Sequence, residues 1–344
     1  MSLKFTDLKQ EGYERVLLAE ERVTGFYSII AIHNTKRGPA LGGCRFFGYH
    51  DEDDQKNDVL KLSKAMTYKN SLADLDFGGG KATINSRVSK NKMYELYGKM
   101  LDHLDGSYIT AGDIGIVDQD LVELKKYTNY VCSTKGTDSG QSTAYGVFNA
   151  ILGYNEFKYD SSSIENKKIV LKGFGKVGSR LAHFCKEVGA IVEVVDFESN
   201  RSLIENAGFK FLSKYQNTSF DSIDIFSPCA TGGDLNTEFI EFANSVKIDC
   251  VIGAANNQLE NNTIEKNLFD MGITFCPDYC VNAGGVIILA LRSSIKEDME
   301  YLDTEAKNKL IGIKNQLIKI LTLSKEKNQL TTVSSNELAE AGFQ

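Results

Sequence analysis

The alternation of apolar and polar stretches along the chain predicts an α/β protein. In the first half, the pattern favours a short helix near the N-terminus and strands over 22–33, 81–85 and 107–111. Longer helices are expected over 51–72 and 89–104, and the first of them carries Val59, Leu62 and Met66 at helical spacing. Long helices between short strands indicate helices layered on a sheet.

The second half repeats a strand-then-helix order more regularly. A helix over 143–157 leads to a strand over 168–172, and further strands are expected near 191–196, 223–227, 247–253 and 273–276. A long amphipathic helix over 305–327 follows. This alternation predicts a doubly wound parallel sheet, the Rossmann arrangement. We therefore expect two α/β domains, one over 1–142 that residues 325–344 complete and one over 143–324, with the chemistry in a cleft between them.

Composition narrows the class of protein. The 344 residues include 42% hydrophobic and 25% charged residues and carry a net charge of −7, which argues against a nucleic-acid or membrane surface. No apolar run approaches the ~20 residues of a membrane span, and the N-terminus does not resemble a signal peptide. We expect a soluble, cytoplasmic protein. The 7 scattered cysteines and 4 unclustered histidines favour reduced thiols and no metal cofactor.

Residues 168–178 read KIVLKGFGKVG, an apolar strand followed by a glycine-rich turn. In a dinucleotide-binding loop, Gly173 would permit a tight turn, Gly175 would let a pyrophosphate approach, and Gly178 would let the next helix pack closely. Asp196 ends the following strand at about the spacing expected for the acid that binds ribose hydroxyls, which favours NAD over NADP. The alternative is that Asp196 only caps the next helix, and Arg201 nearby leaves the strictness of the NAD preference open.

Three charged residues in the first half are candidates for chemistry. Lys69 extends the stripe of Val59 and Met66, where an ammonium needs an anionic partner, although a lysine that reaches solvent from a helix end gives the same pattern. Lys81 follows three glycines and would be shielded enough to act as a base, or it is an exposed lysine after a turn. Asp113 follows a strand end, where catalytic groups collect, or it caps a helix that begins near residue 117.

These motifs together resemble a known family. The segments ALGGCR, AMTYKN, FGGGKA, YITAGDIG, STAYGV, GFGKVG, SPCATGG, GAANNQL and PDYCVNAGGVI occur in the order found in the glutamate/leucine/phenylalanine/valine amino-acid dehydrogenases, and they resemble the leucine enzymes most. The resemblance implies an N-terminal α/β domain for substrate and oligomerisation and a Rossmann NAD-binding domain. It also implies a homo-oligomer that acts on an amino acid, a 2-oxo acid and ammonia.

Site residues follow from the same resemblance. It implies that Lys69 binds the substrate carboxylate, that Lys81 is the catalytic base, and that Asp113 is its proton-transfer partner. Asn257 would also touch the substrate. The residues implied in cofactor binding are Thr143, Gly173, Gly175, Lys176, Val177, Gly178, Asp196, Ala230, Ala255, Asn256 and Asn282.

The substrate side chain is expected to be apolar. Glutamate enzymes of this family place a lysine before the Gly-Gly of the first motif and a hydroxyl residue after Asn-Ala-Gly-Gly, whereas this chain has Leu41 and Leu289 there. A carboxylate facing two leucines would be unpaired, so we expect glutamate to be rejected. The expected pocket comprises Leu41, Gly42, Met66, Ala111, Val286 and Leu289.

The expected reaction is oxidative deamination of leucine, isoleucine or valine, which differ too little for the sequence to rank. An aromatic substrate such as phenylalanine stays open, because phenylalanine enzymes have a similar leucine at the position of Leu289. An inactive NAD-binding sensor or assembly protein is the other alternative. The presence of Lys69, Lys81 and Asp113 favours an enzyme.

Overall fold

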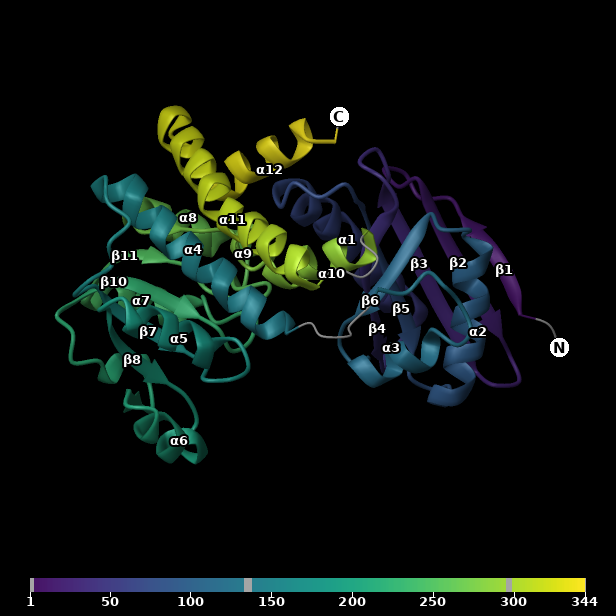
Figure 1. The fold of residues 1–344 in the computed structure, drawn as a ribbon, viewed down its shortest axis with the longest axis horizontal. Helices are drawn as coiled ribbons and strands as arrows, with labels where there is room; N and C mark the ends of the chain where they lie inside the picture. The colour runs from purple at the N-terminus through teal and green to yellow at the C-terminus, as the bar shows by residue number, and fades with distance from the viewer. Residues whose placement is uncertain (1–2, 133–137, 295–298, 344) are drawn as a thin grey trace. The chain divides into compact units, whose positions relative to one another are not determined.

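The computed structural model describes residues 3–132, 138–294 and 299–343, and it forms two compact units (Figure 1). The first unit comprises Met1–Thr137, Val286–Leu302 and Ala339–Gln344, and the second comprises Asp138–Gly285 and Asp303–Leu338. The second unit begins at Asp138, a few residues before the domain boundary that we expected near residue 143. Residues 325–338 stay with the second unit, unlike the expectation, because Thr331 and Thr332 hydrogen-bond to Glu265 there. Only the last residues join the first unit, where Ser71 donates to the carbonyl of Ala339.

A mixed six-stranded sheet forms the centre of the first unit, in the order β1-β2-β3-β5-β4-β6. Its strands are β1 (Lys4–Leu8), β2 (Arg15–Glu21), β3 (Phe26–Asn34), β4 (Ala40–Phe47), β5 (Gly78–Asn85) and β6 (Tyr108–Gly112). The unit also contains α1 (Glu52–Leu72), α2 (Lys90–His103) and α3 (Asp118–Leu124). The β1-β2-β3-β5 pairs are antiparallel, whereas β4 runs parallel to both β5 and β6.

Helices cover both faces of this sheet, because successive strand residues point to opposite sides. Val16 and Ile29 pack with Val59 of α1, whereas their neighbours Leu17 and Ile30 belong to the larger cluster that includes α2. Asp51 begins α1 as its N-cap, since its carboxylate accepts from the backbone N–H of Asp54.

The short helix expected near the N-terminus is wrong. The segment RVLLAEE forms β2, and β1 pairs with it antiparallel. Leucine, alanine and glutamate favour helix locally, but pairing of β2 with β3 along its length buries Val16, Leu17 and Ala19. The pairing partner therefore overrides local propensity here.

The three glycines before Lys81 lie inside β5 and do not form a turn. A Cβ atom on Gly79 would lie 2.1 Å from the backbone nitrogen of Thr67 in α1. The glycines therefore let α1 lie directly on the strand. Lys81 follows these glycines in β5 and is buried. The interpretation of Lys81 as an exposed lysine after a turn is therefore excluded.

A fully parallel six-stranded sheet forms the second unit, in the order β12-β11-β10-β7-β8-β9. Its strands are β7 (Lys168–Lys172), β8 (Ile191–Val195), β9 (Lys210–Leu212), β10 (Ser222–Pro228), β11 (Lys247–Val251) and β12 (Thr274–Phe275). The expected doubly wound sheet is confirmed, with the short edge strand β9 added. The strand order reverses between β7 and β10, which is the switch point where ligands bind in such sheets.

The first helix of this unit precedes β7, and the others lie between or after its strands in chain order. They are α4 (Ser139–Tyr159), α5 (Gly178–Glu187), the 3-10 turn Glu198–Asn200, α6 (Arg201–Asn206), the 3-10 turn Tyr215–Asn217, α7 (Thr237–Ser245), α8 (Asn262–Asp270) and α9 (Asp278–Val281). The chain then forms α10 (Gly284–Ser294), α11 (Met299–Lys327) and α12 (Thr331–Ala341), whose residues are divided between the two units. Among the described residues, no helix is both long and apolar enough to span a bilayer.

Candidate active site

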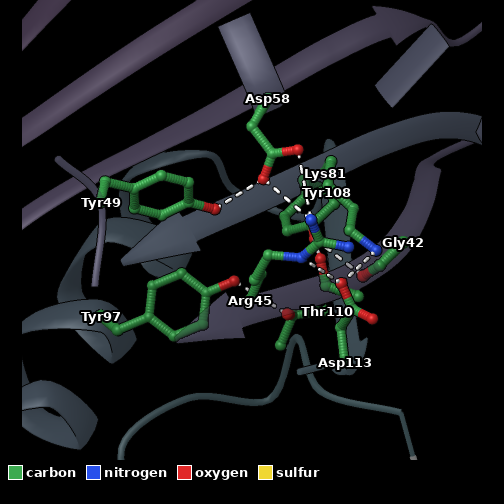
Figure 2. A network of polar contacts seen from close by, with 10 residues as sticks. Gly42, Arg45, Tyr49, Asp58, Lys81, Tyr97, Tyr108, Thr110 and Asp113 are labelled. Carbon is green, nitrogen blue, oxygen red and sulfur yellow. Dashed lines mark hydrogen bonds and ion pairs between the residues drawn. The ribbon is translucent and has the colours of Figure 1, made fainter. Parts of the chain in front are cut away.

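Lys81 and Asp113 form a shielded ion pair in the first unit (Figure 2). Lys81 lies on β5, and Asp113 follows the last residue of β6, on the far side of β4. The Nζ of Lys81 is 2.9 Å from Oδ2 of Asp113, and the side chains are 8% and 23% exposed. The structure therefore brings the predicted catalytic pair together. Val117, not Asp113, is the N-cap of α3, so the helix-cap alternative does not apply.

Arg45, on the strand between them, contacts the same carboxylate. Its Nε donates to Oδ2 of Asp113 at 3.1 Å, and its Nη1 donates to Asp58 on α1. Burial raises the pKa of Asp113, but the charge of Lys81, its hydrogen bond and the charge of Arg45 outweigh burial and lower the pKa below its ordinary value. The carboxylate is therefore ionised at neutral pH.

Sequence reasoning did not single out Arg45 or Asp58. Arg45 ends the ALGGCR motif, but its role depends on β4 lying between β5 and β6, which the sequence alone does not give. Asp58 lies on α1 and points at the sheet from one turn before Leu62. The one signal in the sequence is a single arginine directly after the uncharged segment ALGGC.

Lys69 lies in the last turn of α1 and is half-buried. The expected buried stripe is partly wrong. Val59 is buried, but Met66 is only half-buried, and the positions that face the sheet include the polar residues Gln55, Ser63, Thr67 and Asn70. Polar residues fit there because the sheet offers partners; for example, the amide of Asn70 donates to the carbonyls of Leu41 and Gly78.

Part of the expected substrate pocket comes together around Gly42 on β4. A Cβ on Gly42 would lie 3.4 Å from Cγ of Met66, so these two predicted residues adjoin. The hydroxyl of Tyr108 donates to the carbonyl of Gly42 at 2.7 Å and fixes this backbone (Figure 2). Leu41 and Ala111 are fully buried, on neighbouring strands β4 and β6.

Two further predicted pocket residues lie on α10. Val286 and Leu289 are three residues apart on this helix, hence on one face, and both are half-buried. Both belong to the part of α10 that groups with the first unit.

In the second unit, the glycine loop between β7 and α5 has the shape that a dinucleotide needs. Gly173 has φ +102°, and a Cβ on Gly178 would lie 1.9 Å from the carbonyl oxygen of Gly173. These two glycines are therefore required by the turn and the close packing of α5. A Cβ on the exposed Gly175 would meet no atom within 4 Å, so this position is open to a ligand. The loop fits a pyrophosphate at the start of α5.

The loops after three adjacent strands meet beside this glycine loop. The N–H of Cys229 donates to the carbonyl of Lys172, and the N–H of Ala255 donates to the carbonyl of Pro228. A Cβ on Gly173 would lie 2.8 Å from the backbone nitrogen of Ala230. The predicted cofactor residues Gly173, Ala230 and Ala255 thus lie at one sheet edge, at the switch point.

Asn256 and Asn257 lie in the loop after β11, and the side chain of Asn282 contacts this loop. The buried amide of Asn282 donates to Oδ1 of Asn256 at 2.8 Å and to the carbonyl of Ala254. Asn257 is exposed, has φ +53°, and its N–H donates to Asp278. Asn282 therefore holds this turn in place, and Asn257 lies in the second unit, in the loop after β11.

Thr143, Lys176 and Val177 lie near the starts of α4 and α5. Thr143 lies in the first turns of α4, and its hydroxyl donates to the carbonyl of Ser139. Lys176 packs its carbon chain against Gly140, where a Cβ would lie 2.6 Å from Cγ of Lys176, and Val177 is the N-cap of α5.

Asp196 holds the glycine loop from the end of β8. Its Oδ2 accepts from the N–H of Phe174 at 2.5 Å, and its Oδ1 accepts from the N–H of Phe197 and the amide of Asn200. It thus bonds both to the start of the next 3-10 turn and to the glycine loop itself. The guanidinium of Arg201 is paired with Glu198 and Glu205.

A glycine-lined edge at the switch point of a parallel sheet is typical of dinucleotide-binding oxidoreductases, and a buried lysine–carboxylate pair in a second sheet is a candidate for proton transfer. The comparisons with known proteins agree. Residues 14–130 match the dimerisation domain of the Glu/Leu/Phe/Val dehydrogenases, and residues 196–342 match the Glutamate/Leucine/Phenylalanine/Valine dehydrogenase family.

Similar proteins span almost the whole chain. Phenylalanine dehydrogenase of Caldalkalibacillus thermarum is 34% identical over 96% of this chain and 91% of its own. Leucine dehydrogenase of Geobacillus stearothermophilus is 35% identical over 98% and 92%. The crystal structure of L-tryptophan dehydrogenase from Nostoc punctiforme superposes with a TM-score of 0.85, at 31% identity and 96% coverage of both chains.

The chain belongs to the Glu/Leu/Phe/Val dehydrogenase family. The expected family and two-domain α/β class are therefore confirmed, and the protein is an amino-acid dehydrogenase. These enzymes depend on a pyridine nucleotide.

Proposed function

We propose that the protein catalyses NAD-dependent oxidative deamination of an apolar L-amino acid, with leucine, isoleucine or valine as the preferred substrates. The observation that carries the proposal is the 2.9 Å ion pair of Lys81 with Asp113, buried in a sheet whose neighbouring residues Leu41 and Ala111 are apolar. The products are the 2-oxo acid and ammonia. An inactive sensor would have no need to keep two charged groups in so shielded a place, because burying them costs free energy.

Lys69 binds and orients the substrate in this proposal. Its ammonium holds the α-carboxylate from the last turn of α1, next to Met66 and Gly42. A charge-assisted contact of this kind fixes the amino acid by one end and leaves the side chain to the apolar residues.

Lys81 and Asp113 handle the protons. Once the pair has released a proton, the neutral amine of Lys81 takes a proton from the water as the water oxygen bonds to the iminium carbon. Asp113 relays this proton from Lys81 to the nitrogen. When the C–N bond breaks, the hydroxyl proton returns to Lys81, and ammonia and the 2-oxo acid leave. Such transfers need the two groups within hydrogen-bond reach, which they are.

The glycine loop and its neighbours would hold the dinucleotide. Gly175 leaves room for the pyrophosphate, the N-terminus of α5 supplies N–H donors, and Ala230 and Ala255 line the same edge. When bound, the nicotinamide accepts the hydride from the substrate Cα. Thr143 and Asn282 are the residues we assign to the nicotinamide end, together with Asn256.

NAD is preferred over NADP in this proposal, because Asp196 would repel a 2′-phosphate. Arg201, the residue that could attract one, is already paired with Glu198 and Glu205. The substitution Asp196→Asn should weaken NAD binding and narrow the ratio of NAD to NADP turnover. An unchanged ratio would leave Asp196 with only its role in fixing the loop.

The substrate proposal is tested with a panel of amino acids. NADH formation is measured with leucine, isoleucine, valine, phenylalanine, tryptophan and glutamate at equal concentration. We expect the three aliphatic amino acids to give the highest kcat/KM and glutamate the lowest. Preference for an aromatic amino acid, as the names of two similar proteins suggest, would keep the reaction and change the substrate. Preference for glutamate would contradict the apolar pocket of Leu41 and Leu289.

We also propose that the protein acts as a homo-oligomer. The matched family domain over residues 14–130 is described as a dimerisation domain, and β1 leaves one edge of the first sheet unpaired within the described chain. Light scattering on the purified protein tests this directly, and a monomer at micromolar concentration would contradict it.

A further inference from the structure

We infer that Arg45, held in place by Asp58 and Tyr49, is a positioning residue that orients Asp113 toward Lys81 and sets the charge around the pair. The inference rests on the proposed function. Arg45 does not touch the reacting atoms in this scheme, and it acts only through Asp113.

Arg45 connects three separate parts of the fold, because it lies on β4 and contacts both Asp58 on α1 and Asp113 after β6 (Figure 2). Arg45 on β4 sends Nε to Asp113 at 3.1 Å and Nη1 to Asp58 on α1 at 3.0 Å. Behind it, the hydroxyl of Tyr49 donates to the same oxygen of Asp58 at 2.7 Å. A planar guanidinium with its donors at fixed angles can hold two carboxylates in a defined relative position, which a flexible ammonium cannot.

Both cations meet Asp113 on one oxygen. Lys81 and Arg45 both contact Oδ2. Two cations on the same oxygen restrict where that oxygen can lie and hold the carboxylate toward Lys81. Arg45 contributes to this orientation because its side chain is only 19% exposed and its guanidinium is held at two atoms. Its Nε contacts Asp113, and its Nη1 contacts Asp58.

The charges of the network balance as two acids and two bases. Lys81 from β5 and Arg45 from β4 face Asp113 after β6 and Asp58 from α1. The titratable groups Cys44 and Tyr49 adjoin them and stay neutral. Burial raises the pKa of the Cys44 thiol to about 12, and burial together with the Asp58 carboxylate raises the pKa of the Tyr49 hydroxyl well above its ordinary value.

Removing the charge of Arg45 or the charge of Asp58 therefore changes the net charge around Lys81 and Asp113 in a known direction. Without the guanidinium of Arg45, two carboxylates share one ammonium, and the pair releases a proton less readily. Without the charge of Asp58, Arg45 acts undiminished on Asp113 and Lys81, and the pair releases a proton more readily. A residue that only supported the fold would not produce opposite shifts.

The test measures kcat, KM and the pH profile of amino-acid oxidation for Arg45→Met, Arg45→Lys, Asp58→Asn and Tyr49→Phe. We expect Arg45→Met to lower kcat about 10–100-fold with little change in KM, and Arg45→Lys to recover part of the loss. The acid limb of the profile should move to higher pH in Arg45→Met and to lower pH in Asp58→Asn, each on the order of one pH unit. Tyr49→Phe should move the acid limb to higher pH, as Arg45→Met does, but by a smaller amount.

A matched control comes from Arg37 in the same unit. Its side chain is 20% exposed, it pairs with Asp74, and it also donates to a backbone carbonyl, but it lies outside the network of Lys81 and Asp113. Arg37→Met should cost comparable stability and leave kcat and the pH profile unchanged. Equal activity losses in Arg37→Met and Arg45→Met, or acid limbs that move together in Arg45→Met and Asp58→Asn, would overturn the inference.

The design separates this inference from the proposed function. If the wild-type protein oxidises none of the amino acids in the panel, the proposed function fails before any variant is compared. If the wild type is active and Arg45→Met matches it in kcat and pH profile, only the role of Arg45 fails. Thermal unfolding of each variant shows whether a loss of activity reflects loss of fold.

Discussion

The candidate sites in the two halves of the chain are built on different physical principles. The site in the first unit consists of side-chain charges, with Lys81, Asp113 and Arg45 shielded from water and tied to one another. The site in the second unit consists of backbone, because Gly173 and Gly178 let the chain turn and pack closely. The first half depends on which charges are present, and the second depends on the absence of side-chain atoms. The two halves should therefore respond differently to substitution.

The largest effect is expected where a single charge carries the chemistry. Lys81→Ala should lower kcat by about 1,000-fold or more, since it deletes the base, while NADH still binds to the second unit. Turnover and NADH fluorescence titration measure the two halves separately. Lys90→Ala, which removes a lysine paired with Asp120 elsewhere in the same unit, is the control and should keep its activity. Normal turnover in Lys81→Ala would remove Lys81 from the mechanism.

A second substitution tests binding rather than chemistry. Lys69→Ala should raise KM for the amino acid about 10–100-fold, because it removes a charge-assisted contact to the carboxylate, with a smaller effect on kcat. Initial rates over a range of substrate concentrations distinguish the two constants. Lys64→Ala, which removes an exposed lysine from the same helix α1, serves as the control. An unchanged KM would show that another residue holds the carboxylate.

The backbone half is tested by adding a single methyl group. Gly175→Ala should weaken dinucleotide binding about 10-fold and leave thermal stability unchanged, because the new Cβ meets no protein atom within 4 Å. Gly312→Ala on α11 also meets no atom within 4 Å and should affect neither property adversely. Calorimetric titration with NADH and thermal unfolding provide the readouts. Full binding by Gly175→Ala would place the pyrophosphate elsewhere.

The smallest effect concerns stability at acid pH. The pKa of Asp113 is lowered in the folded protein from an ordinary value of 3.8, so its ion pairs stabilise the fold above that value and stop doing so as the pH falls through the lowered pKa. Asp113→Asn should therefore be less stable than wild type at neutral pH, and the difference should shrink below about pH 4. Urea unfolding across this range measures it, with the exposed Asp53→Asn as a control. A difference that persists at low pH would mean that packing, not charge, is responsible.

Much of this protein was predictable because its signals are local. The strand KIVLK, the glycine loop after it and Asp196 lie within one βαβ segment, so their spacing already specifies their geometry. The motifs around Lys69, Lys81 and Asp113 likewise identify the family from residue types alone, which the comparisons confirm.

Other features required the tertiary structure, because they depend on pairing between distant segments. The segment RVLLAEE becomes β2 only through its partners β1 and β3, and the glycines before Lys81 become part of a strand because α1 lies on them. Arg45 meets Asp113 and Asp58 only because β4 lies between β5 and β6 beneath α1. The amino-acid sequence specifies which charges and glycines are present. The strand order sets which charges touch, because Coulomb attraction and hydrogen bonding act over a few ångströms of space rather than along the chain.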